Sequence, residues 1–178
     1  MPVLVEAISV ITQAISISTK FNGGWEAFNA CIRNKTMCAD GEIIRTGFMT
    51  PNDVESFVKT LERHGLVYLR SGEAIDVAVV DPLQRLATQC PWLQFGRVSL
   101  GNSPDQPVAA CRLAGSTSTE VVTPLSWKFE NSLSQSYAFI PTEHRDKSMI
   151  FLRNENGVDV YFNSVTGQEM CVGRTPSV

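Results

Sequence analysis

Apolar and polar positions follow a helical period most clearly within Pro51–His64, where apolar side chains recur every three or four residues. Thr50 precedes this segment as a capping residue, and proline suits the first helical position. Gly65 suits the left-handed conformation that ends many helices. The apolar face consists of Val54, Phe57, Val58 and Leu61. The pattern therefore predicts a helix over Pro51–His64.

A second, shorter helix is expected near residues 22–32, because its apolar side chains also recur at helical spacing. Between the two helices, residues 36–38 and 42–48 have the composition of strands. They flank the pair Asp40-Gly41, which is typical of a tight hairpin turn. This region therefore predicts a helix followed by a β-hairpin.

Apolar runs and alternating positions indicate further strands on both sides of these helices. Residues 3–11 form an apolar run that we interpret as a first strand, and residues 66–70 and 75–80 follow the long helix. Residues 12–21 fit either a strand or a helical turn, and the pattern leaves both open. The order of elements over residues 3–70 is that of the split β-α-β arrangement in ferredoxin-like folds.

The pattern changes at about residue 89, where proline and glycine become frequent and the apolar runs shorten. Residues 93–100 and 108–113 are joined by a turn-rich connection that suits a hairpin. Three further strands, separated by Asn-Gly and Thr-Gly pairs, predict a three-stranded meander at residues 149–153, 158–163 and 168–172. We expect the second half to be mostly antiparallel β.

These patterns predict an α+β fold with two regions. The first, at residues 1–88, is a ferredoxin-like α+β region, and the second, at residues 89–178, is β-rich and ends in the meander. The two regions form either separate domains or one continuous domain.

Composition and charge are typical of a globular protein and argue against some classes of partner. Of 178 residues, 43% are hydrophobic and 19% are charged, which is enough apolar material for a core without metal or disulfide support. The chain has 15 basic and 18 acidic residues and no run of lysine or arginine, which argues against nucleic-acid binding. The apolar segment that contains Glu6 is read as a strand, so neither a signal peptide nor a membrane span is expected.

Cysteine usage indicates a reducing compartment. The five cysteines form no CxxC pair, which fits reduced thiols in the cytoplasm better than a disulfide framework. The spacing of cysteine and histidine gives no closed zinc site, and no phosphate-binding loop or GxSxG motif occurs. We therefore expect no metal and no cofactor. The cysteines are Cys31, Cys38, Cys90, Cys111 and Cys171.

A polar segment around His144 is the first candidate for chemistry. Glu143 and Asp146 place carboxylates beside this histidine, and histidine is the commonest general base at neutral pH. A solvated loop histidine is the competing interpretation. His64, the other histidine, is placed at the end of the predicted long helix, where a cation interacts favourably with the helix dipole.

Among the thiols, Cys38 beside the hairpin turn and Cys90 before Pro91 are the candidates for an accessible, reactive group. Cys31 and Cys111 lie on apolar faces and are expected to pack as small hydrophobes.

Four aromatic residues are candidates for lining a ligand pocket or a subunit contact, because tryptophan and tyrosine are favoured at interfaces. They are Trp92, Phe95, Trp127 and Tyr137. Packing in the core is the competing interpretation for each of them.

Three segments carry a resemblance to other proteins. Residues 23–28, 38–42 and 47–55 resemble uncharacterised bacterial proteins, which implies a bacterial, cytoplasmic protein but no particular activity. The order of elements in the first half is also similar to that of small ferredoxin-like regulatory domains that bind ligands.

The function predicted from these observations is a non-catalytic bacterial cytoplasmic module that binds a small molecule or a protein, alone or as a homo-oligomer. Nucleic acid and membrane are not expected partners. The first alternative is a small enzyme with a site between the two halves that uses His144 or an accessible cysteine. The second alternative is a partner protein of the immunity or antitoxin kind, which the small size and mild acidity also fit.

Overall fold

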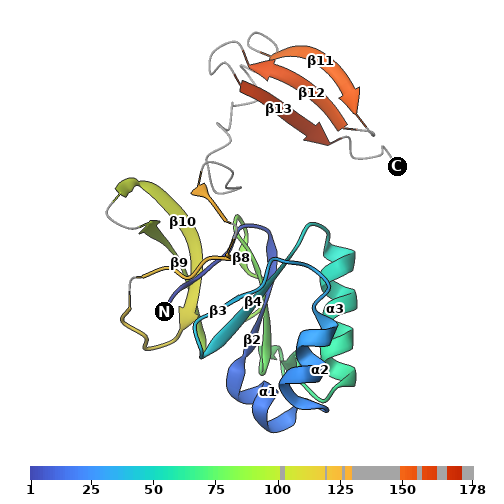
Figure 1. The fold of residues 1–178 in the computed structure, drawn as a ribbon, viewed down its shortest axis with the longest axis vertical. Coiled ribbons are helices and arrows are strands. Elements are labelled where there is room, and N and C mark those ends of the chain that lie inside the picture. Colours follow the sequence, from blue (N-terminus) through green and yellow to red (C-terminus); the bar gives the residue numbers. More distant parts are fainter. Residues whose placement is uncertain are drawn as a thin grey trace. The chain divides into compact units, whose positions relative to one another are not determined.

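A computed structural model describes residues 1–100, 103–118, 120–125, 127–129, 149–155, 158–163 and 168–173. Contacts divide the chain into two units, Met1–Gln135 and Ser136–Val178, and each is described by itself. Helices and antiparallel sheets occur together, which confirms the α+β class (Figure 1). Among the described residues, no helix has the length and apolar character needed to cross a membrane.

The first unit is built on a five-stranded antiparallel sheet with the order β3-β4-β2-β7-β8. Its strands are β2 (Ile8–Gln13), β3 (Cys38–Ala39), β4 (Ile43–Phe48), β7 (Val77–Asp81) and β8 (Arg85–Leu86). β2 is central, and its Val10 lies opposite Thr46 of β4 and Val79 of β7.

The predicted hairpin around Asp40-Gly41 is confirmed as the antiparallel pair β3–β4. Gly41 has a φ of 93°, a conformation that glycine adopts without strain. The Asp40 carboxylate accepts hydrogen bonds from the backbone N–H groups of Glu42 and Ile43, each at 2.9 Å. Asp40 and Gly41 therefore fix the turn together.

Three helices precede or follow these strands: α1 (Ala14–Lys20), α2 (Gly24–Cys31) and α3 (Pro51–Arg63). The prediction for α3 is confirmed, with Thr50 accepting a hydrogen bond from the backbone of Asp53 at 3.2 Å and His64 as the C-cap residue. The four residues of its apolar face are all buried. The shorter helix is confirmed at α2.

The ambiguous segment 12–21 is divided between the two structures that the pattern allowed. β2 continues to Gln13, and α1 begins at Ala14. The Gln13 N–H group donates to the Asp76 carbonyl at 3.0 Å, and the Ala14 N–H group donates to the Glu42 carbonyl at 2.9 Å. Carbonyl groups from distant parts of the chain thus accept hydrogen bonds from the backbone N–H groups at the point where the strand becomes a helix.

The Asp76 carboxylate ties α1 to the segment that leads into β7. It is 2% exposed and accepts hydrogen bonds from Ser16 Oγ at 2.7 Å, Lys20 Nζ at 2.6 Å and the Val67 N–H group at 2.9 Å. Burial by itself raises the pKa of Asp76, but these hydrogen bonds outweigh it and the pKa lies below its usual value.

A second sheet contains β1 (Val3–Leu4), β10 (Ser103–Leu113) and β9 (Leu93–Leu100), in the order β1-β10-β9. The single strand expected at residues 3–11 is therefore wrong, because residues 3–4 pair with β10 and residues 8–13 pair in the central sheet. The chain passes from one sheet to the other over residues 5–7. A short pair, β5 (Leu69–Arg70) with β6 (Glu73–Ala74), follows α3.

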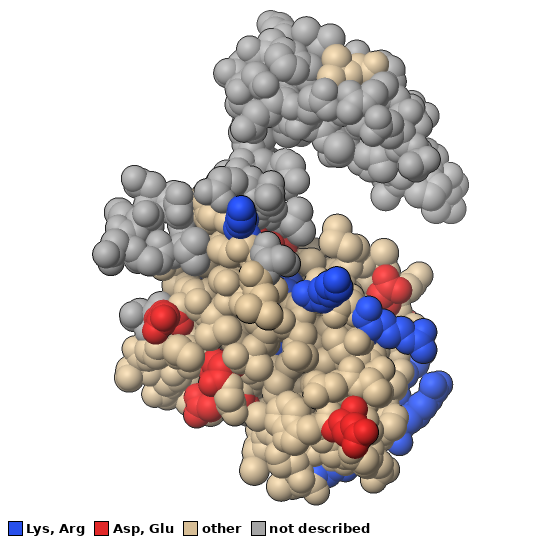
Figure 2. Space-filling model, viewed as in Figure 1, with Lys and Arg blue, Asp and Glu red and all other residues tan. Residues whose placement is uncertain are grey.

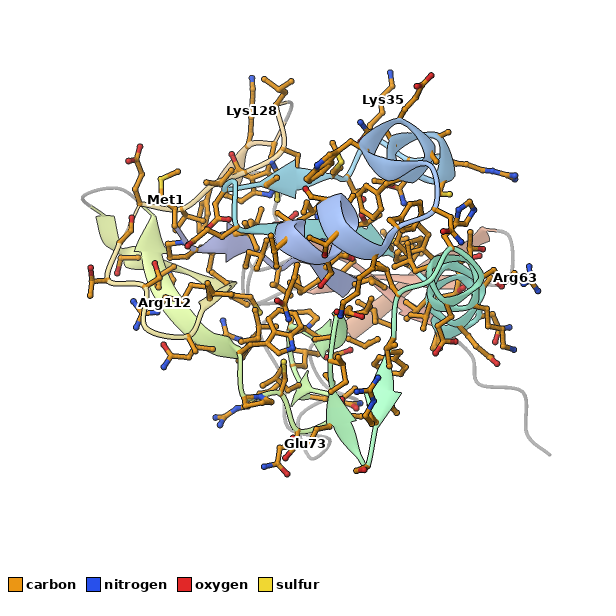
Figure 3. The ribbon with its side chains drawn as sticks, turned by 90° about the horizontal axis from the view of Figure 1, so that it is seen from below. Met1, Lys35, Arg63, Glu73, Arg112 and Lys128 are labelled. Carbon is orange, nitrogen blue, oxygen red and sulfur yellow. The ribbon has the colours of Figure 1, made fainter. Side chains whose placement is uncertain are left out.

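Alternation along the central strands separates two cores. Ile11 and Ile43 belong to the core that also contains Val3, Ala109 and Cys111 of the second sheet. The other core consists of alternate residues of the central strands and side chains of the three helices, such as Val10, Ile44, Phe28, Phe57 and Leu61. The helices thus lie on one side of the central sheet and β9 and β10 on the other, as Figures 1 and 3 show.

The second unit contains β11 (Met149–Glu155), β12 (Val158–Asn163) and β13 (Gln168–Gly173), paired antiparallel in that order. The predicted three-stranded meander is confirmed. The Asn-Gly and Thr-Gly pairs predicted as its turns lie outside the described residues. The division of the chain into domains at residues 88 and 89 stays a prediction.

Candidate functional site

The segment around His144 lies outside the described residues, and so do its neighbours Glu143 and Asp146 and the aromatic candidate Tyr137. Their roles stay predictions.

The two thiols expected to be accessible are both buried. Cys38 is 6% exposed and Cys90 is 8% exposed, and both belong to the core between the two sheets. Burial raises the pKa of Cys38, although the nearby charge of Arg45 opposes this, and burial raises the pKa of Cys90 to about 11. The expectation of accessibility is corrected, because β3 directs Cys38 into the core rather than towards the turn.

The aromatic candidates are partly buried. Trp92 and Phe95 pack against the core between the sheets, and the Trp92 indole donates to the Ala74 carbonyl at 3.0 Å. Trp127 lies edge to face with Phe129, with ring centres 6.3 Å apart. A role of these rings in binding a ligand or a subunit stays a prediction.

A groove of about 690 Å³ lies on the helix side of the first unit, and we name it the α2–α3 groove. Residues 30–34 and Thr36, at the end of α2 and beyond it, form one wall, and residues 46–49 at the end of β4 and just after it form another. α3 contributes Asp53, Ser56, Phe57 and Thr60. The lining combines apolar side chains with hydroxyl, amide and charged groups.

Hydrogen bonds fix the wall that follows α2 against β4. Asn34 Nδ2 donates to the Gly47 carbonyl at 2.9 Å, and the Gly47 N–H group donates to Thr36 Oγ1 at 2.8 Å. The rings of Phe48 and Phe57, with centres 5.1 Å apart, form the apolar part of the groove. Hydrogen bonds thus join the first two walls of the groove, and the ring contact joins β4 to α3.

Arg45 supports this wall from the other face of β4. Its guanidinium is buried and donates to Ser9 Oγ through Nε and to the Thr36 carbonyl through Nη1, each at 2.9 Å. A Cβ atom on Gly47 would lie 2.4 Å from this guanidinium, so the close approach requires glycine there. Burial lowers the pKa of Arg45, but arginine keeps its charge in proteins.

Cys31, which lines the groove, is in contact with His64. Cys31 is half-buried, lines the groove, and has its Sγ atom 4.0 Å from His64 Nε2. His64 Nδ1 lies 3.0 Å from the Asn22 carbonyl oxygen, which can only accept, so we assign the proton to Nδ1. In the neutral ring Nε2 then has a free lone pair directed at the thiol.

The turn between α1 and α2 holds His64 in place. The Phe21 ring stacks on the imidazole with centres 4.6 Å apart, and the Asn22 N–H group donates to the His64 carbonyl at 2.8 Å. Gly65 has a φ of 102°, and a Cβ atom there would lie 2.8 Å from the Lys20 carbonyl oxygen. Arg63, the residue before His64, points outward at the edge of the molecule in Figure 3.

Sequence reasoning did not find this pair. Cys31 is not the fully buried hydrophobe that was expected, whereas the placement of His64 at the end of α3 is confirmed. The two residues are 33 positions apart, and neither carries a local motif that could have signalled the contact.

A second groove of about 720 Å³ lies beside the first and includes Lys35, Met37 and Leu125. Met37 is 41% exposed, and Leu125 is fully exposed, so this surface is more open. Its lining includes the buried thiol of Cys38 but not the Cys31–His64 pair.

Charged groups give no simpler indication of a ligand. Among the described residues, there is no group of three or more histidine, cysteine, aspartate or glutamate side chains that could hold a metal ion. On the face shown in Figure 2, positive and negative side chains are interspersed with uncharged ones. The candidate site therefore rests on the shape and lining of the α2–α3 groove.

Comparison of the chain with protein-family models, with curated proteins and with solved structures found no match.

Proposed function

We propose that this protein is a non-catalytic bacterial cytoplasmic module that binds a small molecule in the α2–α3 groove. The observation that carries the proposal is the groove itself, whose volume of about 690 Å³ lies in the range of small-molecule sites. Such sites are mostly apolar and contain a few placed polar groups, as this lining does.

The lining indicates the chemical class of the ligand. Phe48 and Phe57 offer ring surface to an apolar part, and the Ser56 and Thr60 hydroxyls can donate or accept hydrogen bonds. Side chains of opposite charge, Arg33 and Asp53, also line the groove. This combination suits an amphipathic molecule that is uncharged or zwitterionic.

We also propose the ferredoxin-like arrangement for the first unit. The antiparallel order β3-β4-β2-β7 supports it, since α1 and α2 connect β2 to β3 and α3 connects β4 to β7. Small regulatory domains of this arrangement bind ligands, although the fold alone does not establish a function.

Native mass spectrometry of the full chain, purified gently from bacterial cytosol, tests the binding proposal. We expect a discrete extra mass on the folded protein that a denatured sample lacks. In Ser56→Trp the indole fills the groove, and the occupied fraction should fall about tenfold or more, which corresponds to about 1.4 kcal/mol of binding free energy.

Glu26→Trp is the matched control, because Glu26 is exposed on α2 and is not part of the groove lining. The same indole there should leave the extra mass unchanged. A bare wild-type protein contradicts binding, and an extra mass that persists in Ser56→Trp contradicts the groove as its site.

The alternative of a small enzyme that uses His144, and that of an immunity-type partner, both remain predictions.

A further inference from the structure

The Cys31–His64 pair has the parts of an activated thiol, and its thiol lines the α2–α3 groove. We propose that Cys31 is a modification site that forms a mixed disulfide with a low-molecular-weight disulfide, and that this closes one end of the α2–α3 groove. The effect on the groove rests on the proposed function, whereas the reactivity of the thiol does not.

The first observation is a base held in one orientation. His64 Nδ1 donates to the Asn22 carbonyl and Phe21 stacks on the ring, so the imidazole cannot easily turn away. Nε2 lies 4.0 Å from Cys31 Sγ, which places the lone pair within reach of the thiol proton. An oriented base beside a thiol is the usual arrangement of an activated cysteine.

The second observation is the charge that proton transfer would create. His64 is the C-cap residue of α3, an end of the helix where the dipole favours a positive charge. Cys31 is itself the last residue of α2, where the dipole disfavours an anion. Activation must therefore come from His64 rather than from the helix that carries the thiol.

The third observation is access. Cys31 is half-buried and lines a groove of about 690 Å³, whereas the thiols of Cys38, Cys90 and Cys111 are buried in the core between the sheets. A small disulfide can approach Cys31 along the groove.

The chemistry is thiol–disulfide exchange. The Cys31 thiol gives its proton to His64 Nε2, and the thiolate attacks one sulfur atom of the disulfide. The disulfide bond of the reagent breaks as the new bond to Cys31 Sγ forms. The departing thiolate takes the proton from His64, so that the Cys31 sulfur is oxidised and one sulfur of the reagent is reduced to a thiol.

The reaction is measured on the full chain with glutathione disulfide as the probe. Peptide mapping at successive times reports each cysteine separately, and Cys171→Ser removes the thiol carried by β13 of the second unit. We expect Cys31 to be modified at least about tenfold faster than Cys38, Cys90 or Cys111. Equal rates at all four thiols overturn the proposal.

Two measurements separate activation by His64 from simple exposure. His64→Gln should slow the reaction of Cys31 about tenfold or more, because a positioned base contributes at least this much. If that variant does not fold, the native chain is compared with the chain in urea. An activated Cys31 reacts faster in the native chain, and a slower native reaction overturns activation.

Native mass spectrometry of the modified chain then tests the effect on the groove. Loss of the extra mass after modification of Cys31 supports closure, and its retention overturns closure. A reactive Cys31 in a protein that never carries an extra mass refutes the proposed function and leaves the thiol site intact. An unreactive Cys31 in a protein that carries the extra mass refutes the thiol site and leaves the proposed function intact.

Discussion

The two faces of the central sheet differ in where they hold polar groups. On the face covered by β1, β10 and β9, Arg45 is buried in a core that also encloses three thiols. On the face covered by helices, the core is apolar apart from a few buried polar side chains such as Ser16 and Asp76, and further polar groups lie at the helix ends and around the groove. His64, at the end of α3, is an example.

The position of a thiol relative to the core therefore decides whether it can react. Burial raises the pKa of the core thiols and separates them from solvent, whereas Cys31 reaches a groove and a base. On the first face the guanidinium of Arg45 is used in hydrogen bonds to Ser9 and Thr36, whereas on the second face polar groups line the groove.

The largest expected effect of a single substitution is at Arg45. Arg45→Ala removes the hydrogen bonds to Ser9 and Thr36 and leaves a cavity, so we expect the free energy of unfolding to fall by about 3 kcal/mol. Urea unfolding followed by tryptophan fluorescence measures this, since all three tryptophans lie in the first unit.

Arg45→Met is the control, because it fills most of the space without the charge. It should lose about half as much stability. A loss in Arg45→Ala no larger than in Arg45→Met would show that the cavity contributes little and that the lost hydrogen bonds account for the effect.

A smaller effect, and one that depends on pH, is expected at Asp76. Asp76→Asn replaces one accepting oxygen by an amide NH₂ group, which then faces a donor, either the Ser16 hydroxyl or the Val67 N–H group. We therefore expect the free energy of unfolding at pH 7 to fall by about 2 kcal/mol. Because the folded pKa lies below 3.8, the carboxylate stabilises the protein above that pH, and its contribution disappears as pH falls through the folded pKa.

Urea unfolding at pH 7 and at successive values below pH 4 compares the two proteins. The difference in unfolding free energy between wild type and Asp76→Asn should narrow as the pH falls. A difference that is constant with pH would mean that the charge of Asp76 does not stabilise this end of the sheet.

The smallest effect is expected at Thr50. Thr50→Ala removes the side chain that accepts from the Asp53 N–H group, and the loss of such a cap destabilises a protein by about 1 kcal/mol. Thr50→Ser keeps the hydroxyl and should be close to wild type in thermal unfolding. If alanine and serine behave alike, the cap does not help to hold α3 on the helix face.

Local signals explain which elements the sequence predicted. The cap, the proline and the apolar period all lie within α3, and the Asp40-Gly41 turn lies within its hairpin. The division of residues 3–11 between two sheets depends on pairing with β10 and β4, so local patterns could not reveal it.

The candidate site could be predicted even less well than the fold, because it is formed by contacts between residues that are distant in the sequence. Cys38 follows a strand pattern next to a turn, but its direction into the core is set by the pairing of β3 with β4. Cys31 and His64 come together only because the turn at Phe21 and Asn22 docks on the end of α3. A single sequence holds no signal for such a contact.

The pairing of Val3 with Cys111 also sets an order of events during synthesis. The five strands of the central sheet and the helices α1, α2 and α3 leave the ribosome before β10 does. Until β10 arrives, β1 lacks its strand partner, and the face with Ile11, Ile43 and Val80 lacks the cover of Ala109 and Cys111. A nascent chain halted before residue 103 should therefore bind holdase chaperones through this face, and a chain released after residue 113 should not.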